Sequence, residues 1–295
     1  MSPLFRALLI AASLAFATAA PALALDLSAE DRATVSARFE TLHDKVVGGD
    51  MSAAMDMLPP GVIDAMAARY GVTPEQAREA ARENTLPAFR LAREFGAGWV
   101  ELDARRTCDG VVVVHHDAQL DDGRLLAALT VEELPEFVPS LAEALEECQG
   151  LGVNIEIKNL PSDPDYDADH LVSDAVAGLV QAYLGPANAL VSSFNMDALD
   201  RLHGVDSTIP LAYLFDIGDP VSAVDRAVAH EMTAIHPYDP MVTESVVRRA
   251  HDAGLQVNVW TVNDPDRMSA LADMGVDGIC TDVPDVARRV LDARV

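Results

Sequence analysis

Basic residues are scarce in this sequence, and their scarcity excludes whole classes of partner. The 295 residues include 21 Lys and Arg against 47 Asp and Glu, which gives a formal net charge of −26. A charge of this size and sign repels nucleic acids and anionic membranes and attracts divalent cations, so we expect no nucleic-acid partner. Solubility or a salty habitat would produce the same composition, and an acidic surface alone says little about catalysis.

Cysteines and aromatic residues are also few. Three cysteines, Cys108, Cys148 and Cys280, cannot make a complete disulfide framework and show no metal-binding spacing. Aromatic residues make up 5% of the chain and hydrophobic residues 50%, so a core must consist chiefly of Ala, Val, Leu and Ile. That composition suits packed parallel strands and helices. After residue 24 no apolar run approaches the length of about 20 residues that a membrane span needs, so we expect no stable membrane insertion.

The first 24 residues have the pattern of an export signal. Arg6 supplies a positive charge, residues 7–17 are almost wholly apolar, and residues 22–24 (Ala-Leu-Ala) form a small-x-small cleavage site. The apolar run is too short for a comfortable membrane span, and an uncleaved anchor is the alternative. We therefore expect a periplasmic or secreted protein whose signal peptide, residues 1–24, is cut after Ala24.

Residues 25–81 have a helical pattern that differs from the rest of the chain. Ser28 precedes an acidic first turn, Gly48-Gly49 and Pro59-Pro60 interrupt the pattern, and Thr73-Pro74 begins a further helix. We expect a small helical N-terminal segment here and a separate domain over residues 82–295. A partner-binding role for this segment is an alternative function for the chain, and its protein partner is unknown.

From residue 84 onward, short β-rich runs alternate with helical runs. The β-rich runs are 99–104, 111–116, 153–158, 189–194, 210–215, 233–236, 256–262 and 278–281. Helical patterns separate most of them, for example 140–148, 168–184, 196–203, 219–230, 243–253 and 264–274. This alternation predicts an α/β fold of the TIM-type β/α barrel. The interval between 103 and 111 is too short for a helix, which leaves a tight crossover or a hairpin as the connection.

Charged residues occupy three of these runs at positions where a buried strand would not otherwise have them. Glu101 and Asp103 alternate on one strand and share a face, as do Glu156 and Lys158 on another. His116 follows a run of four valines. Inward-facing carboxylates repel each other unless a cation lies between them, and oxygen ligands beside a lysine and a histidine suit metal-assisted phosphoryl chemistry. For each acidic pair taken alone, a solvated strand face is the alternative.

Several segments together resemble the glycerophosphodiester phosphodiesterase family, a group within the PI-PLC-like phosphodiesterase TIM-barrel superfamily. RENT (82–85) resembles its PENT segment, with Arg82 in place of proline. Residues 96–117 resemble its signature of Glu-x-Asp, Thr-x-Asp-Gly and His-Asp, and NIEIK (154–158) is similar to its third metal-ligand segment. SSFN (192–195), LAYLF (211–215), IHP (235–237), VWTVN (259–263) and GVDGICTD (275–282) follow in the family's order, so that the likeness covers residues 82–290.

The resemblance implies metal-dependent hydrolysis of a small glycerophosphodiester to an alcohol and glycerol phosphate, with Ca²⁺ or Mg²⁺ as the cofactor. The general acid would protonate the departing alcohol oxygen, and a lysine would balance the phosphate charge. For the two aromatic residues, core packing is the alternative to substrate contact. The residues carried over are Glu101, Asp103 and Glu156 as metal ligands, His116 as general acid, Lys158, Phe194 and Trp260 as substrate contacts, and Glu83 and Asp117 as structural or site-adjacent residues.

One element of the family has no counterpart in this sequence. The family opens with a strand ending in His-Arg-Gly shortly before the PENT segment, whereas residues 60–81 have a helical pattern and contain no histidine. That histidine is half of the acid–base pair, so the alternative function is a catalytically impaired homologue that still binds metal and phosphodiester. His43 lies on a distant predicted helix, and His115 is predicted to face away from His116, so we expect neither to substitute. The barrel would also lack its first strand, and we expect the exposed edge to be covered.

Overall fold

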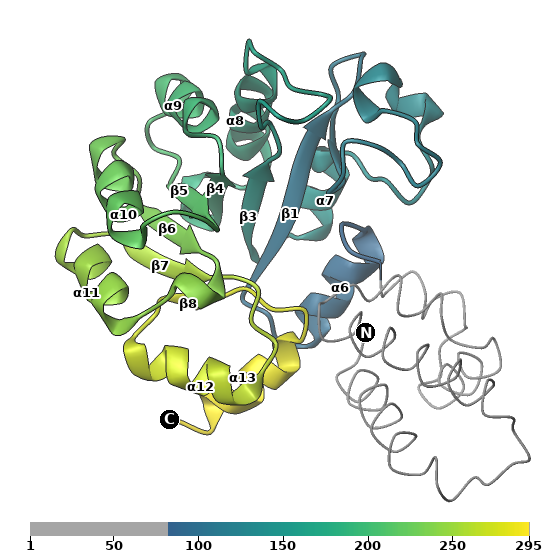
Figure 1. The fold of residues 1–295 in the computed structure, drawn as a ribbon. Helices are drawn as coiled ribbons and strands as arrows, with labels where there is room; N and C mark the ends of the chain where they lie inside the picture. Colours follow the sequence, from purple (N-terminus) through teal and green to yellow (C-terminus); the bar gives the residue numbers. More distant parts are fainter. Residues whose placement is uncertain (1–81, 295) are drawn as a thin grey trace, which may run out of the picture. The chain divides into compact units, whose positions relative to one another are not determined.

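The structure is a computed structural model that describes residues 82–294 (Figure 1). Contacts within the chain separate Asn84–Val295 from the residues before it. The predicted signal peptide (1–24) and helical segment (25–81) lie outside the described residues, as does His43. Within the described part of the chain, no helix is long and apolar enough to cross a membrane.

Eight strands form one curled sheet in the order β2-β1-β3-β4-β5-β6-β7-β8. Every pairing from β1 through β3 to β8 is parallel, and β2 pairs with β1 in the antiparallel direction. The predicted α/β fold is confirmed, and among the described residues no ladder joins β8 to β1, so this sheet curls without closing. The strands are β1 (Trp99–Arg106), β2 (Val112–Val114), β3 (Gly152–Ile157), β4 (Ala189–Ser193), β5 (Leu211–Phe215), β6 (Ala234–Pro237), β7 (Gln256–Val259) and β8 (Gly278–Ile279).

The short interval after β1 is a hairpin, which decides between the two connections that the sequence left open. Arg106 pairs with Val112, and the ladder ends where Ala104 meets Val114. The sequence predicts a strand that continues to residue 116, whereas β2 ends at Val114 and the chain bends from residue 116 onward. His115 and His116 therefore lie in a loop, where the alternation of a strand no longer determines their directions.

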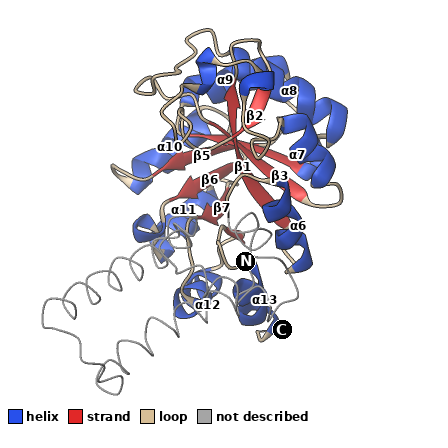
Figure 2. Ribbon diagram, turned by 90° about the vertical axis from the view of Figure 1, so that its right-hand side faces the viewer, coloured by secondary structure: helices blue, strands red, loops and turns tan. Residues whose placement is uncertain are grey.

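Helices cover the outer face of the curled sheet (Figure 2). Several begin at the caps that their sequences predict: Thr243 caps α11, and Asp219 and Asp264 each cap a helix whose first residue is proline. The helices are α6 (Leu86–Glu94), α7 (Leu141–Glu147), α8 (Leu171–Tyr183), α9 (Met196–Val205), α10 (Pro220–Ala229), α11 (Glu244–Asp252), α12 (Pro265–Met274) and α13 (Pro284–Asp292). Short 3-10 turns lie at η1 (Leu126–Ala128), η2 (Val131–Glu133), η3 (Pro186–Asn188) and η4 (Asp239–Met241).

The two faces of each strand have different environments. On β1, Leu102 and Ala104 are fully buried in the main core between the sheet and the helices. Alternate residues point the other way, onto what we call the inner face of the sheet. On that face Leu190, Ala212 and Ala234 form a small separate apolar cluster. Because parallel strands end at the same edge, the polar residues near their carboxyl ends gather at one mouth of the sheet.

Candidate metal centre and active site

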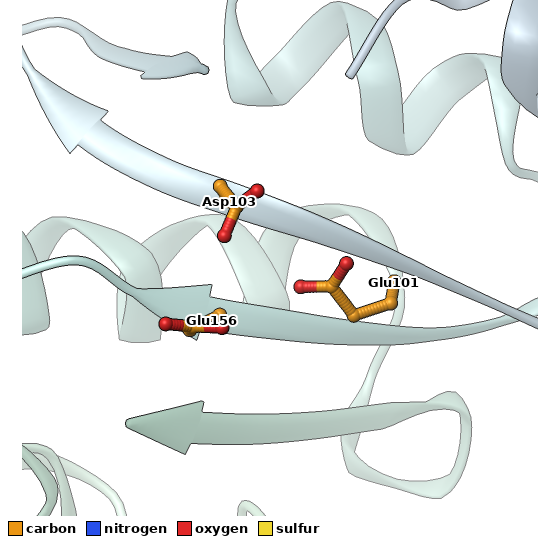
Figure 3. A group of neighbouring side chains, drawn as sticks. All are labelled: Glu101, Asp103 and Glu156. Atoms are coloured by element: carbon orange, nitrogen blue, oxygen red, sulfur yellow. The ribbon is translucent and has the colours of Figure 1, made fainter. Parts of the chain in front are cut away.

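Three carboxyl groups converge on the inner face where β1 lies beside β3 (Figure 3). Glu101, Asp103 and Glu156 each offer one oxygen, and these oxygens all lie within 4.8 Å of one another. The parallel register pairs Asp103 with Glu156, which places their side chains at the same level of the sheet. The sequence pairs Glu101 with Asp103 on one strand face, and the β1–β3 register brings Glu156 beside them.

Asp103 is held from two sides. It is 4% exposed. The Asn84 side-chain amide donates to Asp103 Oδ2 at 2.7 Å, and the Asp103 backbone N–H donates to Asn84 Oδ1 at 3.0 Å. Lys158 Nζ lies 3.4 Å from Asp103 Oδ1. Each oxygen of this carboxylate therefore faces a different donor.

Lys158 lies among the carboxylates, with its Nζ 2.9 Å from Glu156 Oε1. Burial alone would lower the pKa of Lys158, but the charges of Asp103 and Glu156 outweigh it and raise the pKa. Burial raises the pKa of Glu156, Lys158 opposes this, and the neighbouring Asp103 adds to it. A cation at this cluster would favour the ionised form of Glu156 for the same reason that Lys158 does.

The residues present fit a hard divalent cation. Carboxylate oxygens are the ligands that Ca²⁺ and Mg²⁺ prefer, and three of them meet here on two adjacent strands. Two further polar atoms nearby, Ser192 Oγ and Asn154 Oδ1, are buried without a hydrogen-bond partner in the described part of the chain. Ser192 stands opposite Glu156 in the β3–β4 register. Since buried polar atoms are normally paired, these two indicate that the site is built to hold a ligand or ordered water.

His116 lies in the loop after β2, with its side chain about half exposed. Its Nδ1 is 2.8 Å from Asp117 Oδ1, which fixes the ring and leaves Nε2 as the nitrogen that can face a ligand. This hydrogen bond is the main reason why the pKa of Asp117 is lowered, despite its partial burial. His116 is close enough to the carboxylates to lower the pKa of Glu156. His115 bonds through Nδ1 to the backbone carbonyl of Asp117, so both histidines contact the same residue.

A buried arginine, Arg105, fixes the loop that carries His116. It is the next inner-face residue of β1 after Asp103, and its Nε donates to the His116 carbonyl oxygen at 2.8 Å. Its Nη1 donates to both carboxylate oxygens of Asp165, at 2.8 and 2.7 Å, and Asp163 lies 3.4 Å from its Nη2. The Arg105 and Asp165 side chains are only 5% and 4% exposed. Strand β1 thus supplies two of the three carboxylates, Glu101 and Asp103, and the anchor of the histidine loop.

Aromatic side chains line the opposite side of the mouth, after β4, β6 and β7. The Phe194 and Trp260 rings meet edge to face with centroids 5.6 Å apart, and Tyr238 lies 5.3 Å from Trp260. The Trp260 indole Nε1 donates to the His236 carbonyl oxygen at 2.8 Å. Phe194 and Trp260, which the family resemblance assigns to substrate contact, are therefore in contact with each other.

Below these rings, His236 is buried on the inner face of β6. The Asn258 side-chain amide lies 2.9 Å from its Nε2. Burial lowers the pKa of His236 to about 3, so the ring is neutral at physiological pH. A neutral imidazole that accepts from an amide supports the sheet here without adding charge.

Some residues of the site were not among those that the sequence singled out. Glu83 is exposed, and its neighbour Asn84 bonds to Asp103 of the cluster. Arg105 and His236 were also missed. The signal for Arg105 was its position two residues after Asp103 on the same strand face. No local signal pairs His236 with Asn258, because their contact depends on the register between two strands.

Comparison with known proteins agrees with this geometry. The model of the glycerophosphoryl diester phosphodiesterase family matches residues 71–286. A glycerophosphodiester phosphodiesterase of Caldanaerobacter subterraneus subsp. tengcongensis is 28% identical over 224 residues, covering 69% of this chain and 89% of the relative. One of Bacillus altitudinis is 29% identical over 232 residues, covering 70% and 92%.

Solved structures show the same fold. A phosphodiesterase of Oleispira antarctica, in complex with the product sn-glycerol-3-phosphate, superposes with a TM-score of 0.65 at 25% identity, covering 71% of this chain and 91% of that one. A glycerophosphodiester phosphodiesterase of Thermotoga maritima gives 0.60 at 29% identity, covering 70% and 92%. With the family model spanning most of the barrel and the inner-face carboxylates in place, the chain belongs to the glycerophosphoryl diester phosphodiesterase family of phosphoric diester hydrolases.

Proposed function

We propose that this protein hydrolyses small glycerophosphodiesters to an alcohol and glycerol phosphate, using a divalent cation held by Glu101, Asp103 and Glu156. The observation that carries the proposal is the convergence of these three carboxylates within 4.8 Å on a barrel of this family. The relative from Oleispira antarctica was solved with sn-glycerol-3-phosphate as its product, which supports the substrate class. Ca²⁺ or Mg²⁺ bound there would offset the negative charge that develops on the phosphate oxygens.

The chain's own residues divide the remaining work. As the P–O bond to the head-group alcohol breaks, the departing oxygen takes a proton from His116 Nε2. A water oxygen bonds to the phosphorus and releases a proton to solvent, from which His116 is protonated again. Asp117 holds the His116 ring through Nδ1. The Lys158 ammonium, which is buried beside the carboxylates, offsets phosphate charge as a point cation. Phe194 and Trp260 form the wall against which the glycerol or the head group would pack.

A second candidate is a homologue that binds a metal and a phosphodiester but turns substrate over poorly. The sequence favours it through one observation, the lack of a His-Arg-Gly segment before RENT. The family match nevertheless begins at residue 71, within the segment that replaces it. Loss of one acid–base group typically lowers a rate by about 10²–10⁴, which leaves electrostatic catalysis in place. We favour the enzyme because the carboxylates, the lysine and His116 are all retained.

Turnover of glycerophosphocholine by the purified protein, with Ca²⁺ or Mg²⁺, separates the two candidates. We expect the wild type to release choline, and His116→Ala and Glu101→Ala to lose most of that activity. If all three proteins are inactive while Ca²⁺ raises the melting temperature of the wild type and His116→Ala but not of Glu101→Ala, the binding protein is the correct function. If Ca²⁺ and Mg²⁺ leave the stability of the wild type unchanged as well, the metal site is wrong.

Export is part of the same proposal. Residues 1–24 have the charge, apolar run and small-residue site of a signal peptide, and a periplasmic or secreted enzyme would meet diesters outside the cytoplasm. We expect a mature chain that begins at Leu25. Sequencing the N-terminus of protein recovered from the periplasmic fraction checks this, and a cytoplasmic chain that retains Arg6 would contradict it.

A further inference from the structure

We propose that Asn84 is a positioning residue that orients the Asp103 carboxylate for cation binding. This inference rests on the cation site proposed above. Asn84 belongs to the RENT segment, which precedes helix α6. It lies 19 residues before Asp103 in the sequence.

The Asn84 side chain contacts Asp103 through both halves of its amide. Its Nδ2 donates to the Asp103 carboxylate Oδ2 at 2.7 Å, and its Oδ1 accepts from the Asp103 backbone N–H at 3.0 Å. One side chain thus fixes a carboxylate oxygen and the backbone from which that carboxylate projects. A carboxylate held at two points loses little further rotational freedom when it binds a ligand.

The two oxygens of the Asp103 carboxylate have different donors. Asn84 occupies Oδ2, and Oδ1 is the oxygen that Lys158 Nζ approaches at 3.4 Å. Asn84 donates a neutral hydrogen bond, so it restrains the carboxylate without cancelling the charge that attracts a cation. An amide therefore suits this position better than a second lysine, which would compete with the metal.

The backbone of Asn84 explains why this residue type stands here. Its φ is 58°, in the left-handed region that asparagine adopts far more readily than most residues other than glycine. The next residue, Thr85, begins helix α6, its Oγ1 accepting from the Ala88 N–H. Asparagine combines tolerance of this conformation with a short neutral amide that both donates and accepts.

Two substitutions separate the amide from the backbone conformation. Asn84→Gly keeps the left-handed turn and removes the amide, whereas Asn84→Ala removes the amide and strains the turn. We expect both to weaken Ca²⁺ binding by about 10- to 100-fold, as loss of a hydrogen bond to a metal ligand typically does. We also expect Asn84→Ala to melt at a lower temperature than Asn84→Gly. Isothermal titration of the full-length protein with Ca²⁺, and with Mg²⁺, measures the affinities well below either melting temperature.

Thr85→Ala is the matched control, because it weakens the start of helix α6 next to Asn84 without removing the amide. It should lower the melting temperature and leave the Ca²⁺ affinity within about twofold of wild type. Wild-type affinity in both Asn84 variants would show that the residue only shapes the turn, and would overturn the inference while the cation site stands. A wild type that binds neither cation would overturn the proposed cation site itself, and this inference with it.

Discussion

The two sides of the inner face of the sheet differ in the polar side chains that they bury: those on one side are charged and those on the other are neutral. On the side of β1 and β3, charged groups are held together: carboxylates, Lys158 and the buried pair Arg105–Asp165. On the side of β4 to β7, the buried polar groups are neutral, and His236 is paired with Asn258. Charged groups kept out of water are costly unless they are paired or bind an ion.

The difference indicates where the chemistry is concentrated. A neutral, well-paired lining is sufficient to pack a barrel, so the charges beside β1 and β3 need a further reason. The proposed hydrolysis would supply one, because a bound cation and Lys158 would both face an anionic substrate there. The aromatic rings of Phe194 and Trp260 on the other side offer an uncharged surface for the rest of the substrate. The substitutions below test this division, beginning with the largest expected effect.

Glu156→Gln should have the largest effect on cation binding by the charged side of the sheet. It removes one of the three carboxylates and leaves Lys158 with one fewer anionic neighbour. We expect Ca²⁺ affinity to fall by about 10²-fold or more, since loss of a ligand should cost at least as much as loss of a residue that supports one. Isothermal titration measures it. His236→Gln, which changes a neutral group on the other side of the sheet, is the control, and we expect it to change affinity by less than about tenfold. Equal losses in both variants would remove the distinction between the two sides.

Asp165→Asn should show that the charged side also determines stability. It breaks a buried ion pair and leaves Arg105 in the interior with its bond to the His116 carbonyl and the longer contact to the Asp163 carboxylate. We expect the free energy of unfolding to fall by about 3 kcal/mol, as is typical when one partner of a buried pair is removed. Urea denaturation measures it. Asp174→Asn breaks the exposed pair with Arg201 and should cost less than about 1 kcal/mol. A similar loss of unfolding free energy in both variants would show that burial of the Arg105–Asp165 pair does not determine its contribution to stability.

His236→Gln should remove the part of the pH dependence of stability that comes from the neutral side of the sheet. The folded protein does not protonate His236 until about pH 3, whereas the unfolded chain binds that proton below its ordinary value of 6.5. Stability is therefore full above pH 6.5 and falls as the pH drops from 6.5 towards 3, by about 2 kcal/mol at pH 5. The variant should lack this component of the pH dependence. Urea denaturation at pH 7 and pH 5 checks it, and parallel losses in both proteins would be the contrary result.

Trp260→Phe should have the smallest effect. It removes the indole hydrogen bond to the His236 carbonyl but keeps an aromatic ring beside Phe194. The expected loss is about 1 kcal/mol of stability and a rise in KM of about threefold, with kcat nearly unchanged. Steady-state kinetics with glycerophosphocholine measure both constants. A fall in kcat as large as that of His116→Ala would mean that the aromatic side takes part in the chemical step.

The sequence predicted much of the architecture because its signals are local. Alternation of β-rich and helical runs located every described strand, with errors mainly at the ends: the run at 256–262 stops as a strand at Val259, and the run at 278–281 stops at Ile279. The carboxylates were found because residues two apart on a strand share a face. The connection after β1 could not be chosen, since both alternatives fit a short interval.

The parts of the site that escaped prediction depend on contacts between distant segments. Asn84 acts on Asp103 from a turn, and a turn asparagine usually bonds only to its own backbone. Arg105 was missed because a basic residue at the end of a strand more often faces solvent than a buried acid. Each contact depends on how two distant segments are placed beside each other, and the residues near either position do not indicate that placement. Residues that make such contacts are found only after the fold is known.

The hydrogen bonds around Asp103 have a consequence for association between molecules. A strand at the end of a sheet invites another chain to pair with its open backbone groups. On β1, the Asp103 N–H is engaged by the Asn84 side chain, its carbonyl accepts from the His115 N–H at 3.0 Å, and Arg105 is paired with Val113 of β2. The backbone groups of Asp103 and Arg105 are therefore unavailable to an added strand, so pairing of a second chain with this part of β1 would first have to break the bonds to Asn84 and His115.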